Sequence, residues 1–367
     1  MRNFINYVYE ETLTFEQKLL NEIDSLVLSW LSNLHYPSNL KFVESKKRIP
    51  IKDLLDDKEL EQLAHSCFDP QSTVKLLKGI KNSPRFQDLM FSNHVHIYDQ
   101  NLQEQFSATT FHYKDLFSYV SFRGTDNTII GWKEDLNMGF ECPVPAQIGA
   151  LKYLTEIFPT LNKDIYLGGH SKGGNLAVFA GVMANLDIDQ HIIAMYSHDG
   201  PGFLDSFFNS ANFITRKNKI FKTVPEFSIV GLIMEKHEDY KIVKSNGISI
   251  FQHNPFSWFI RKDTFYEVPK LDKQAQNFDS HLNDAISNFP KELRKEAIDD
   301  IYSIFSNANI TLTNEIPKNF PKIIASYKNL SPDRKELIQQ LFDDIFAKKR
   351  NIKRIPRLKT PLLVKKG

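Results

Sequence analysis

Residues 166–181 read YLGGHSKGGNLAVFAG and place Ser171 between two glycine pairs, after a strand-like run and before a helix-like one. In this context, Gly-x-Ser-x-Gly is typical of a sharp strand-to-helix turn that presents a serine above the edge of a sheet. Glycines suit the turn because side chains would collide with the crossing strand and helix. We therefore expect Ser171 to be a nucleophile; the alternative is a structural turn that contains a serine.

The chain around this turn alternates strand-like and helix-like patterns. Residues 94–126 are expected to form β-strands broken by turns. Further strand-like runs are at 164–170, 191–198, 218–234 and 239–246, and helices are expected at 147–161 and 172–186. Strands alternating with helices predict an α/β fold with a parallel or mixed sheet covered on both faces. Together with the Ser171 turn, this indicates an α/β-hydrolase with a mostly parallel central sheet flanked by helices. An amphipathic helix is expected over 13–31.

The pattern divides the chain into three parts. Residues 1–270 are expected to form the α/β domain together with N-terminal helices. Residues 271–347 contain amphipathic helical patterns and predict a C-terminal helical extension. Residues 348–367 hold nine Lys or Arg and no acid, which leaves a net charge of −7 on the rest of the chain. This basic tail is expected to be disordered, with weak contact to an anionic membrane as an alternative.

A nucleophilic serine needs a base and an orienting acid, which follow it in the order serine, acid, histidine in this architecture. His253 is the expected base because it follows a strand-like run and lies in an aromatic-rich loop. The other histidines after the serine are His191, His198, His237 and His281. Asp199, at the end of the 191–198 strand, is the preferred acid. Glu226 is the alternative, and Asp205 and Asp239 are weaker candidates.

The oxyanion hole is expected to use the backbone N–H of Lys172, the residue after the serine, and a donor from Thr125. Thr125 follows a strand and Gly124, and offers both an N–H and a hydroxyl. The Lys172 side chain is expected either to be solvated or to attract an anionic substrate. Residues 126–140, with Ile129, Ile130 and Trp132, are expected to be either a lid or part of the core.

Two segments resemble the paired signature of the class 3 (fungal-type) lipases: VSFRGTDNTIIGWKEDL at 120–136 and GGHSKGGNLA at 168–177. With 13–31, DGPGF, SIVG and QHNPFSW, they more closely resemble the Mbeg-like bacterial domain of unknown function, a lipase-3-like α/β-hydrolase family. The resemblance implies Ser171 as nucleophile, His253 as base, and Thr125 and Lys172 as the oxyanion hole. It leaves the acid open, because the class 3 position falls near Glu226 whereas DGPGF favours Asp199.

Composition limits the remaining possibilities. The 29 Phe supply ample core material, no apolar stretch is long enough to span a membrane, and the first residues lack the apolar region of a secretory signal. Cys67 and Cys142 provide no disulfide framework and suit a reducing cytoplasm. His94 and His96 are expected to be ordinary surface residues rather than metal ligands.

These observations together predict a cytoplasmic serine hydrolase, lipase- or esterase-like, that cleaves a small acyl ester or a lipid without metal or cofactor. A thioesterase or phospholipase would use the same chemistry. The alternative from another class is a catalytically idle binding or scaffold protein with the hydrolase fold. No nucleic-acid partner is expected.

Overall fold

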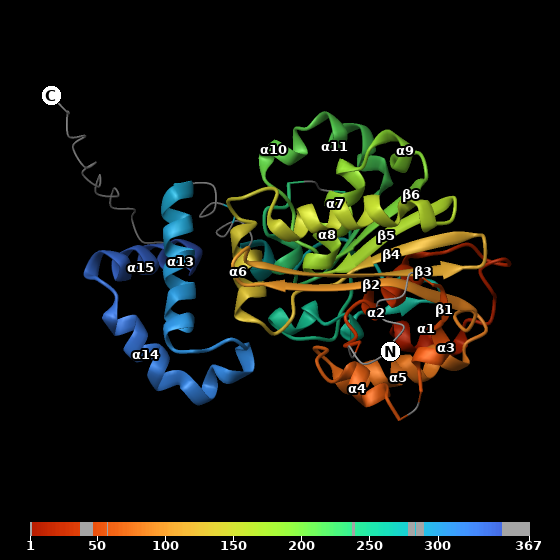
Figure 1. Cartoon of the computed structure of the whole chain (residues 1–367), viewed down its shortest axis with the longest axis horizontal. Helices are drawn as coiled ribbons and strands as arrows, with labels where there is room; N and C mark the ends of the chain where they lie inside the picture. Colours follow the sequence, from red (N-terminus) through yellow and green to blue (C-terminus); the bar gives the residue numbers. More distant parts are fainter. Residues whose placement is uncertain are drawn as a thin grey trace.

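An eight-stranded sheet forms the centre of the molecule, with its strands side by side in the order of the sequence (Figure 1). The computed structural model describes residues 2–36, 47–56, 58–236, 239–277, 283 and 290–346. The strands are β1 (Ile49–Pro50), β2 (Leu89–Asp99), β3 (Glu104–Tyr113), β4 (Phe117–Phe122), β5 (Asp164–His170), β6 (Ile192–His198), β7 (Ile220–Pro225) and β8 (Tyr240–Val243). Strands β1 to β4 pair antiparallel and β4 to β8 parallel. The predicted α/β-hydrolase class is confirmed.

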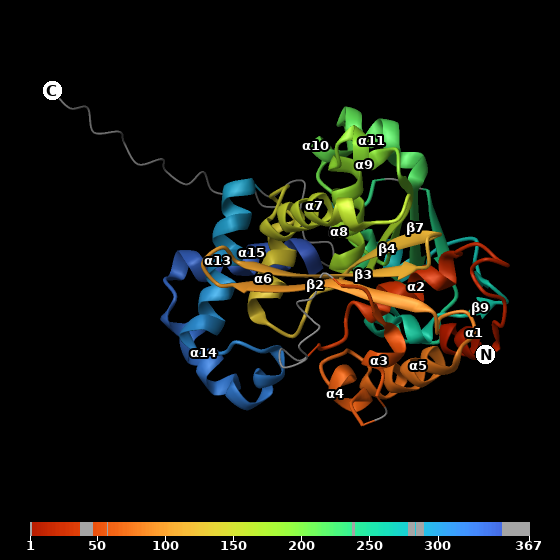
Figure 2. The same cartoon turned by 45° about the vertical axis from the view of Figure 1, so that its right-hand side comes forward.

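Helices cover both faces of this sheet, as Figures 1 and 2 show. One face carries α1 (Phe4–Glu10), α2 (Glu22–Leu31), α3 (Ile51–Leu54), α4 (Leu60–Ala64) and α5 (Pro70–Asn82). The other carries α7 (Pro145–Ile157), α8 (Lys172–Met183), α9 (Leu186–Asp189), α10 (Asp205–Phe208) and α11 (Ala211–Arg216). A small second sheet consists of β9 (Ile260–Arg261) and β10 (Thr264–Phe265). Parallel strands need this double cover because both of their faces are apolar.

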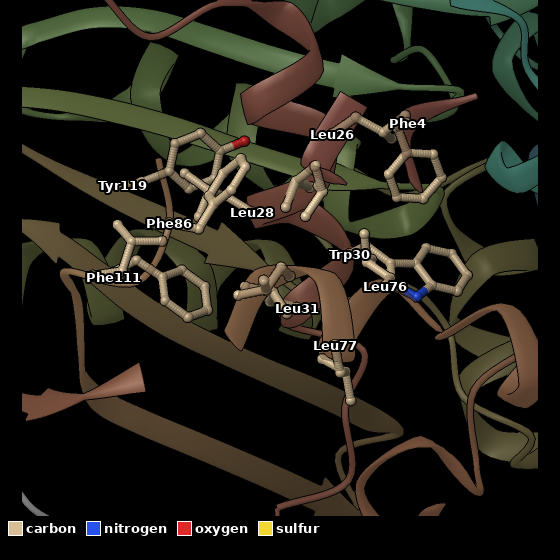
Figure 3. Packing of buried hydrophobic residues seen from close by; sticks show 14 of the residues in the cluster. Phe4, Leu26, Leu28, Trp30, Leu31, Leu76, Leu77, Phe86, Phe111 and Tyr119 are labelled. Atoms are coloured by element: carbon tan, nitrogen blue, oxygen red, sulfur yellow. The ribbon is translucent and has the colours of Figure 1, made fainter. Parts of the chain in front are cut away.

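Side chains of the strands alternate between two hydrophobic cores. Tyr119 of β4 belongs to the core under α1, α2 and α5, and the next residue, Val120, belongs to the core under α7 and α8. Figure 3 shows the first core, in which Leu28 and Leu31 of α2 lie among side chains of α5 and the sheet. This packing fixes α2 across the sheet, close to the carboxyl ends of the parallel strands.

Helix α2 begins nine residues later than the predicted helix over 13–31. Asn21 caps it, and the preceding segment wraps around the guanidinium of Arg85. Arg85 donates to the backbone carbonyls of Leu13, Thr14, Lys18 and Leu19. A helix would have engaged most of these carbonyls in its own hydrogen bonds. Apolar periodicity does not register such a long-range partner, so the first half of the predicted helix is wrong.

The predicted C-terminal extension contains α13 (Lys291–Asn307), α14 (Phe320–Asn329) and α15 (Pro332–Phe346). Of these, α13 lies beside α6 (Ile129–Asn137) in Figure 1, and α14 and α15 pack on α13. Ile129 of α6 packs against Ala308 and Ile310. The Ile129 N–H also donates to the Thr311 carbonyl at 2.8 Å. The boundary at residue 270 stays a prediction, and the basic tail at 348–367 lies outside the described residues.

The apolar residues of the expected lid divide between core and surface. Ile129 and Ile130 are buried, whereas the Trp132 side chain is exposed. Throughout the described ranges, no helix has both the length and the apolar character needed to cross a bilayer.

We expect Arg85→Met to lower the free energy of unfolding by about 3–5 kcal/mol, because it leaves the Asp24 carboxylate buried without its cation. Both side chains of this pair are fully buried, with Nη2 and Oδ2 2.5 Å apart. Urea unfolding measures the loss, with the exposed Arg261→Met as a control that changes stability little. Adding Asp24→Asn to Arg85→Met is expected to restore part of it. Equal stability of Arg85→Met and the control would contradict this account.

Candidate active site

Ser171 occupies a sharp turn between β5 and α8. Its φ is 58° and its ψ −134°, a conformation that residues with a side chain rarely adopt. The Ser171 N–H donates to the His198 carbonyl at 2.9 Å. A Cβ on Gly173 would lie 2.1 Å from the Phe122 carbonyl oxygen, so this position requires glycine. The strand, turn and helix lie where the sequence predicted them.

Asp199 and His253 form a close pair. Asp199 follows β6 directly, is fully buried, and also has a positive φ, 52°. Its Oδ2 lies 2.6 Å from Nδ1 of His253, whose side chain is 25% exposed. Because a carboxylate only accepts, Nδ1 carries the hydrogen, and Nε2 of a neutral ring keeps its lone pair. That arrangement leaves Nε2 available as a base.

The second carboxylate oxygen of Asp199 is held by Ser228, a residue that the sequence analysis did not single out. Ser228 Oγ donates to Asp199 Oδ1 at 2.5 Å, and the Gly231 N–H donates to Ser228 Oγ at 3.0 Å. The expected strand over 218–234 ends at Pro225, and the chain then turns through a 3₁₀-helix, η3 (Val230–Leu232). The sequence feature that could have pointed to Ser228 is the short SIVG segment, in which Ser228 stands three residues before Gly231.

The other acidic candidates have different partners. Glu226 accepts from Lys244 Nζ at 2.8 Å, and Asp205 lies 2.5 Å from Lys236 Nζ. Asp239 immediately precedes β8. Of the two preferred acids, the structure therefore brings Asp199, and not Glu226, to His253.

The other described histidines after the serine are engaged elsewhere. His198 is fully buried, with Nε2 2.9 Å from Ser25 Oγ. His191 Nδ1 donates to the Lys163 carbonyl at 2.9 Å. His237 and His281 lie outside the described residues.

His170, the residue before Ser171, connects the turn to the loop of His253. Its Nε2–H donates to the His253 carbonyl at 2.9 Å, and the two imidazole rings lie 4.6 Å apart. Burial, with a smaller effect of His253, lowers the pKa of His170 well below its usual value, so this ring stays neutral. The contact holds His253 beside the residue that precedes the serine.

The turn that contains Thr125 packs against the serine. A Cβ on Gly124 would lie 2.9 Å from the His170 carbonyl oxygen and 3.4 Å from Ser171 Cβ. Thr125 Oγ1 donates to Asp135 Oδ2 at 2.5 Å, so its hydroxyl hydrogen is engaged and its N–H is the group left for an oxyanion. Burial raises the pKa of Asp135 to about 6, although Lys172 and Thr125 both act to lower it.

The Lys172 side chain lies in the interior, and both expectations for it were wrong. Its Nζ is buried and donates to the Gln105 carbonyl at 2.8 Å and to Glu134 Oε2 at 3.0 Å. The charge is therefore neutralised beneath α6, because Glu134 points inward from that helix. The Lys172 N–H, at the first position of α8, is still a suitable oxyanion donor.

A mostly parallel sheet with helices on both faces and a strained serine after a central strand defines an α/β-hydrolase fold. A family model described as Mbeg1-like matches residues 80–303, and the chain belongs to this family, as its motifs predicted. Among solved structures, the crystal structure of M37 lipase is similar, with 14% identity and a TM-score of 0.35 over 57% of this chain and 67% of that chain. A comparison with curated proteins found no match.

Asp135 gives a pH-dependent test of the buried contact beneath Thr125. Its pKa is near 3.8 in the unfolded chain and about 6 in the folded protein, so its neutral form contributes stability below pH 4 that is lost as the pH rises through 6. From pH 5 to pH 8 we expect wild type to lose roughly 1–2 kcal/mol relative to Asp135→Asn. Denaturant unfolding of both proteins at the two pH values measures this difference. Parallel pH profiles would show that Asp135 is not perturbed.

Proposed function

We propose that this protein is a serine hydrolase that cleaves carboxylic esters through an acyl-enzyme. The observation that carries the proposal is the Asp199–His253 hydrogen bond, which lies against His170, the residue before a serine in a strained strand-to-helix turn. Nucleophile, base and acid arranged in this way are the parts that ester hydrolysis needs.

In the first half of the reaction, His253 Nε2 takes the Ser171 hydroxyl proton while Oγ attacks the ester carbonyl carbon. Asp199 holds the imidazole through Nδ1 and stabilises the positive charge that forms on it. When the tetrahedral intermediate collapses, the alkoxide leaves with the proton from His253. Ser171 then carries the acyl group.

In the second half, water attacks the acyl carbonyl and gives its proton to His253. Collapse of the second tetrahedral intermediate releases the carboxylic acid and returns a proton to Ser171. The burial of Asp199 and its bond from Ser228 fix the acid, so the histidine keeps one orientation throughout.

The N–H groups of Thr125 and Lys172 are the proposed donors to the oxyanion. Both belong to segments fixed by packing: the Thr125 turn is held by Asp135, and Lys172 begins α8. Donors fixed in advance stabilise the charge that develops in the transition state at no cost of reorganisation. Loss of one such donor typically costs about 10²–10³ in rate.

The loop before His253 favours an ester with an apolar acyl chain. Ile248, Ile250 and Phe251 are all more than half exposed in the residues that lead to the proposed base. An apolar rim at this place fits a lipase or esterase, and a thioesterase or phospholipase fits the same chemistry. The cytoplasmic location and the contact of the tail with anionic membranes stay predictions.

Labelling with a fluorophosphonate, which reacts with activated serines, tests the proposal. We expect wild type to label, Ser171→Ala not to label, and His253→Ala and Asp199→Ala to label at least ~100-fold more slowly. Glu226→Ala is the matched control, because its carboxylate pairs with Lys244, and we expect its rate to stay close to wild type. Circular dichroism verifies that each variant is folded. A folded wild type that does not label would instead support the idle scaffold.

A further inference from the structure

Arg123, the first residue after β4, carries a charge that no described residue pairs. The residue is 8% exposed. Its backbone N–H donates to the Ser107 carbonyl, but no side-chain hydrogen bond or ion pair joins its guanidinium to any described residue. Arg85 and Lys172, also buried, are each paired with a carboxylate. A cation removed from most of the solvent is stabilised by an opposite charge, so an anion is the partner that would suit Arg123.

The groups around Arg123 supply further donors and no compensating charge. His35, His94 and His96 all have a lowered pKa, first because of burial and in smaller part because of the Arg123 charge. His94 has a pKa of about 3 and stacks edge-on against Tyr36, with ring centroids 4.6 Å apart. Neutral imidazoles next to a guanidinium present N–H groups that suit phosphate or carboxylate oxygens.

Two carboxylates that act on the same neighbouring groups are engaged by other residues. Asp126, whose charge acts to raise the pKa of His96, accepts from both the N–H and the hydroxyl of Thr128. The charge of Asp69 acts to raise the pKa of the Cys67 thiol. The Asp69 carboxylate caps α5 by accepting from the Ser72 N–H at 3.0 Å, and it also accepts from Asn254. Neither forms an ion pair with Arg123.

Arg123 also directly precedes the turn at the serine. A Cβ on Gly124 would lie 3.4 Å from Ser171 Cβ, and the Gly124 N–H donates to Asn33 Oδ1 at 3.3 Å. The Arg123 side chain lies on the α2 side of the sheet, where its charge acts to lower the pKa values of Tyr36 and Cys67. Arg123 therefore stands two residues before Thr125, one of the two proposed oxyanion donors.

We propose that Arg123 binds an anionic group of the substrate, a phosphate or a carboxylate, and so selects acyl esters that carry one. This inference rests on the proposed function, and names the substrate class of that site. Guanidinium is suited to the task because its planar donors bind either oxyanion with two hydrogen bonds. It also assigns to Arg123 the attraction that the sequence analysis considered for Lys172.

Two matched substrate pairs test the inference. In the soluble pair, 4-nitrophenyl butyrate is neutral and mono-4-nitrophenyl glutarate carries a carboxylate. In the lipid pair, a monoacylglycerol is compared with the monoacylglycerol phosphate of the same acyl chain. We expect wild type to prefer the anionic member of one pair by at least ~10-fold in kcat/KM, and the pair that shows it identifies the source of the anion.

Variants then locate this preference. Arg123→Gln is expected to remove it, Arg123→Lys to keep part of it, and the exposed Arg261→Gln to leave it unchanged. The readout is the ratio of kcat/KM within each pair, so a general loss of activity does not imitate the result. Equal rates on both members of both pairs in wild type, or a preference that survives in Arg123→Gln, overturns the inference.

A binding measurement separates this inference from the proposed function. Inorganic phosphate is expected to raise the Tm of wild type and Arg261→Gln by a few degrees, compared with chloride at equal ionic strength, and to raise that of Arg123→Gln less. If wild type neither labels with fluorophosphonate nor cleaves esters, the proposed function fails, and this difference alone decides whether Arg123 binds anions. Identical phosphate effects on all three proteins exclude it.

Discussion

The pairing of β5 with β6 is the constraint on which the rest of the candidate site depends. Their parallel register places His170 opposite His198, so the residues that follow, Ser171 and Asp199, leave the sheet side by side. Both have a positive φ, and the Ser171 N–H donates to the His198 carbonyl. The same hydrogen bonds that build the sheet therefore set the distance between the serine and the acid. The loop of His253 completes the site from a third segment.

Buried charge is treated differently in three parts of the molecule. Arg85 is neutralised by Asp24 and organises the N-terminal segment, and Lys172 is neutralised by Glu134 beneath α6. Arg123 is also buried, at 8% exposure, but has no carboxylate partner among the described residues. Structural cations are compensated within the chain because an isolated buried charge is unstable. Arg123 comes directly before the turn that packs against Ser171, and we propose that a substrate supplies the opposite charge there.

Local patterns predicted the elements well where neighbours in sequence decide the structure. The strand, the glycine turn and the helix around Ser171 lie as expected, because steric limits on a turn act over a few residues. The helix over 13–31 was wrong in its first half, because Arg85 binds the carbonyls of that segment from 66 or more residues away. The strand expected to include Ser228 ends early, because that residue turns to hold Asp199.

The sequence by itself determined the α/β class, the family and the position of the serine turn, because alternating patterns and glycine spacing are local properties. It left the choice between Asp199 and Glu226 as the acid undecided. It also predicted a solvated or substrate-attracting Lys172 side chain, whereas that side chain is buried. Tertiary structure alone decided that Asp199 contacts His253 while Glu226 pairs with Lys244. It also decided that Lys172 pairs with Glu134, whereas Arg123 meets no carboxylate in the part of the chain that the structure describes. Such choices depend on which groups meet across distant strands and loops, and an ion pair forms only where folding brings opposite charges within a few ångströms.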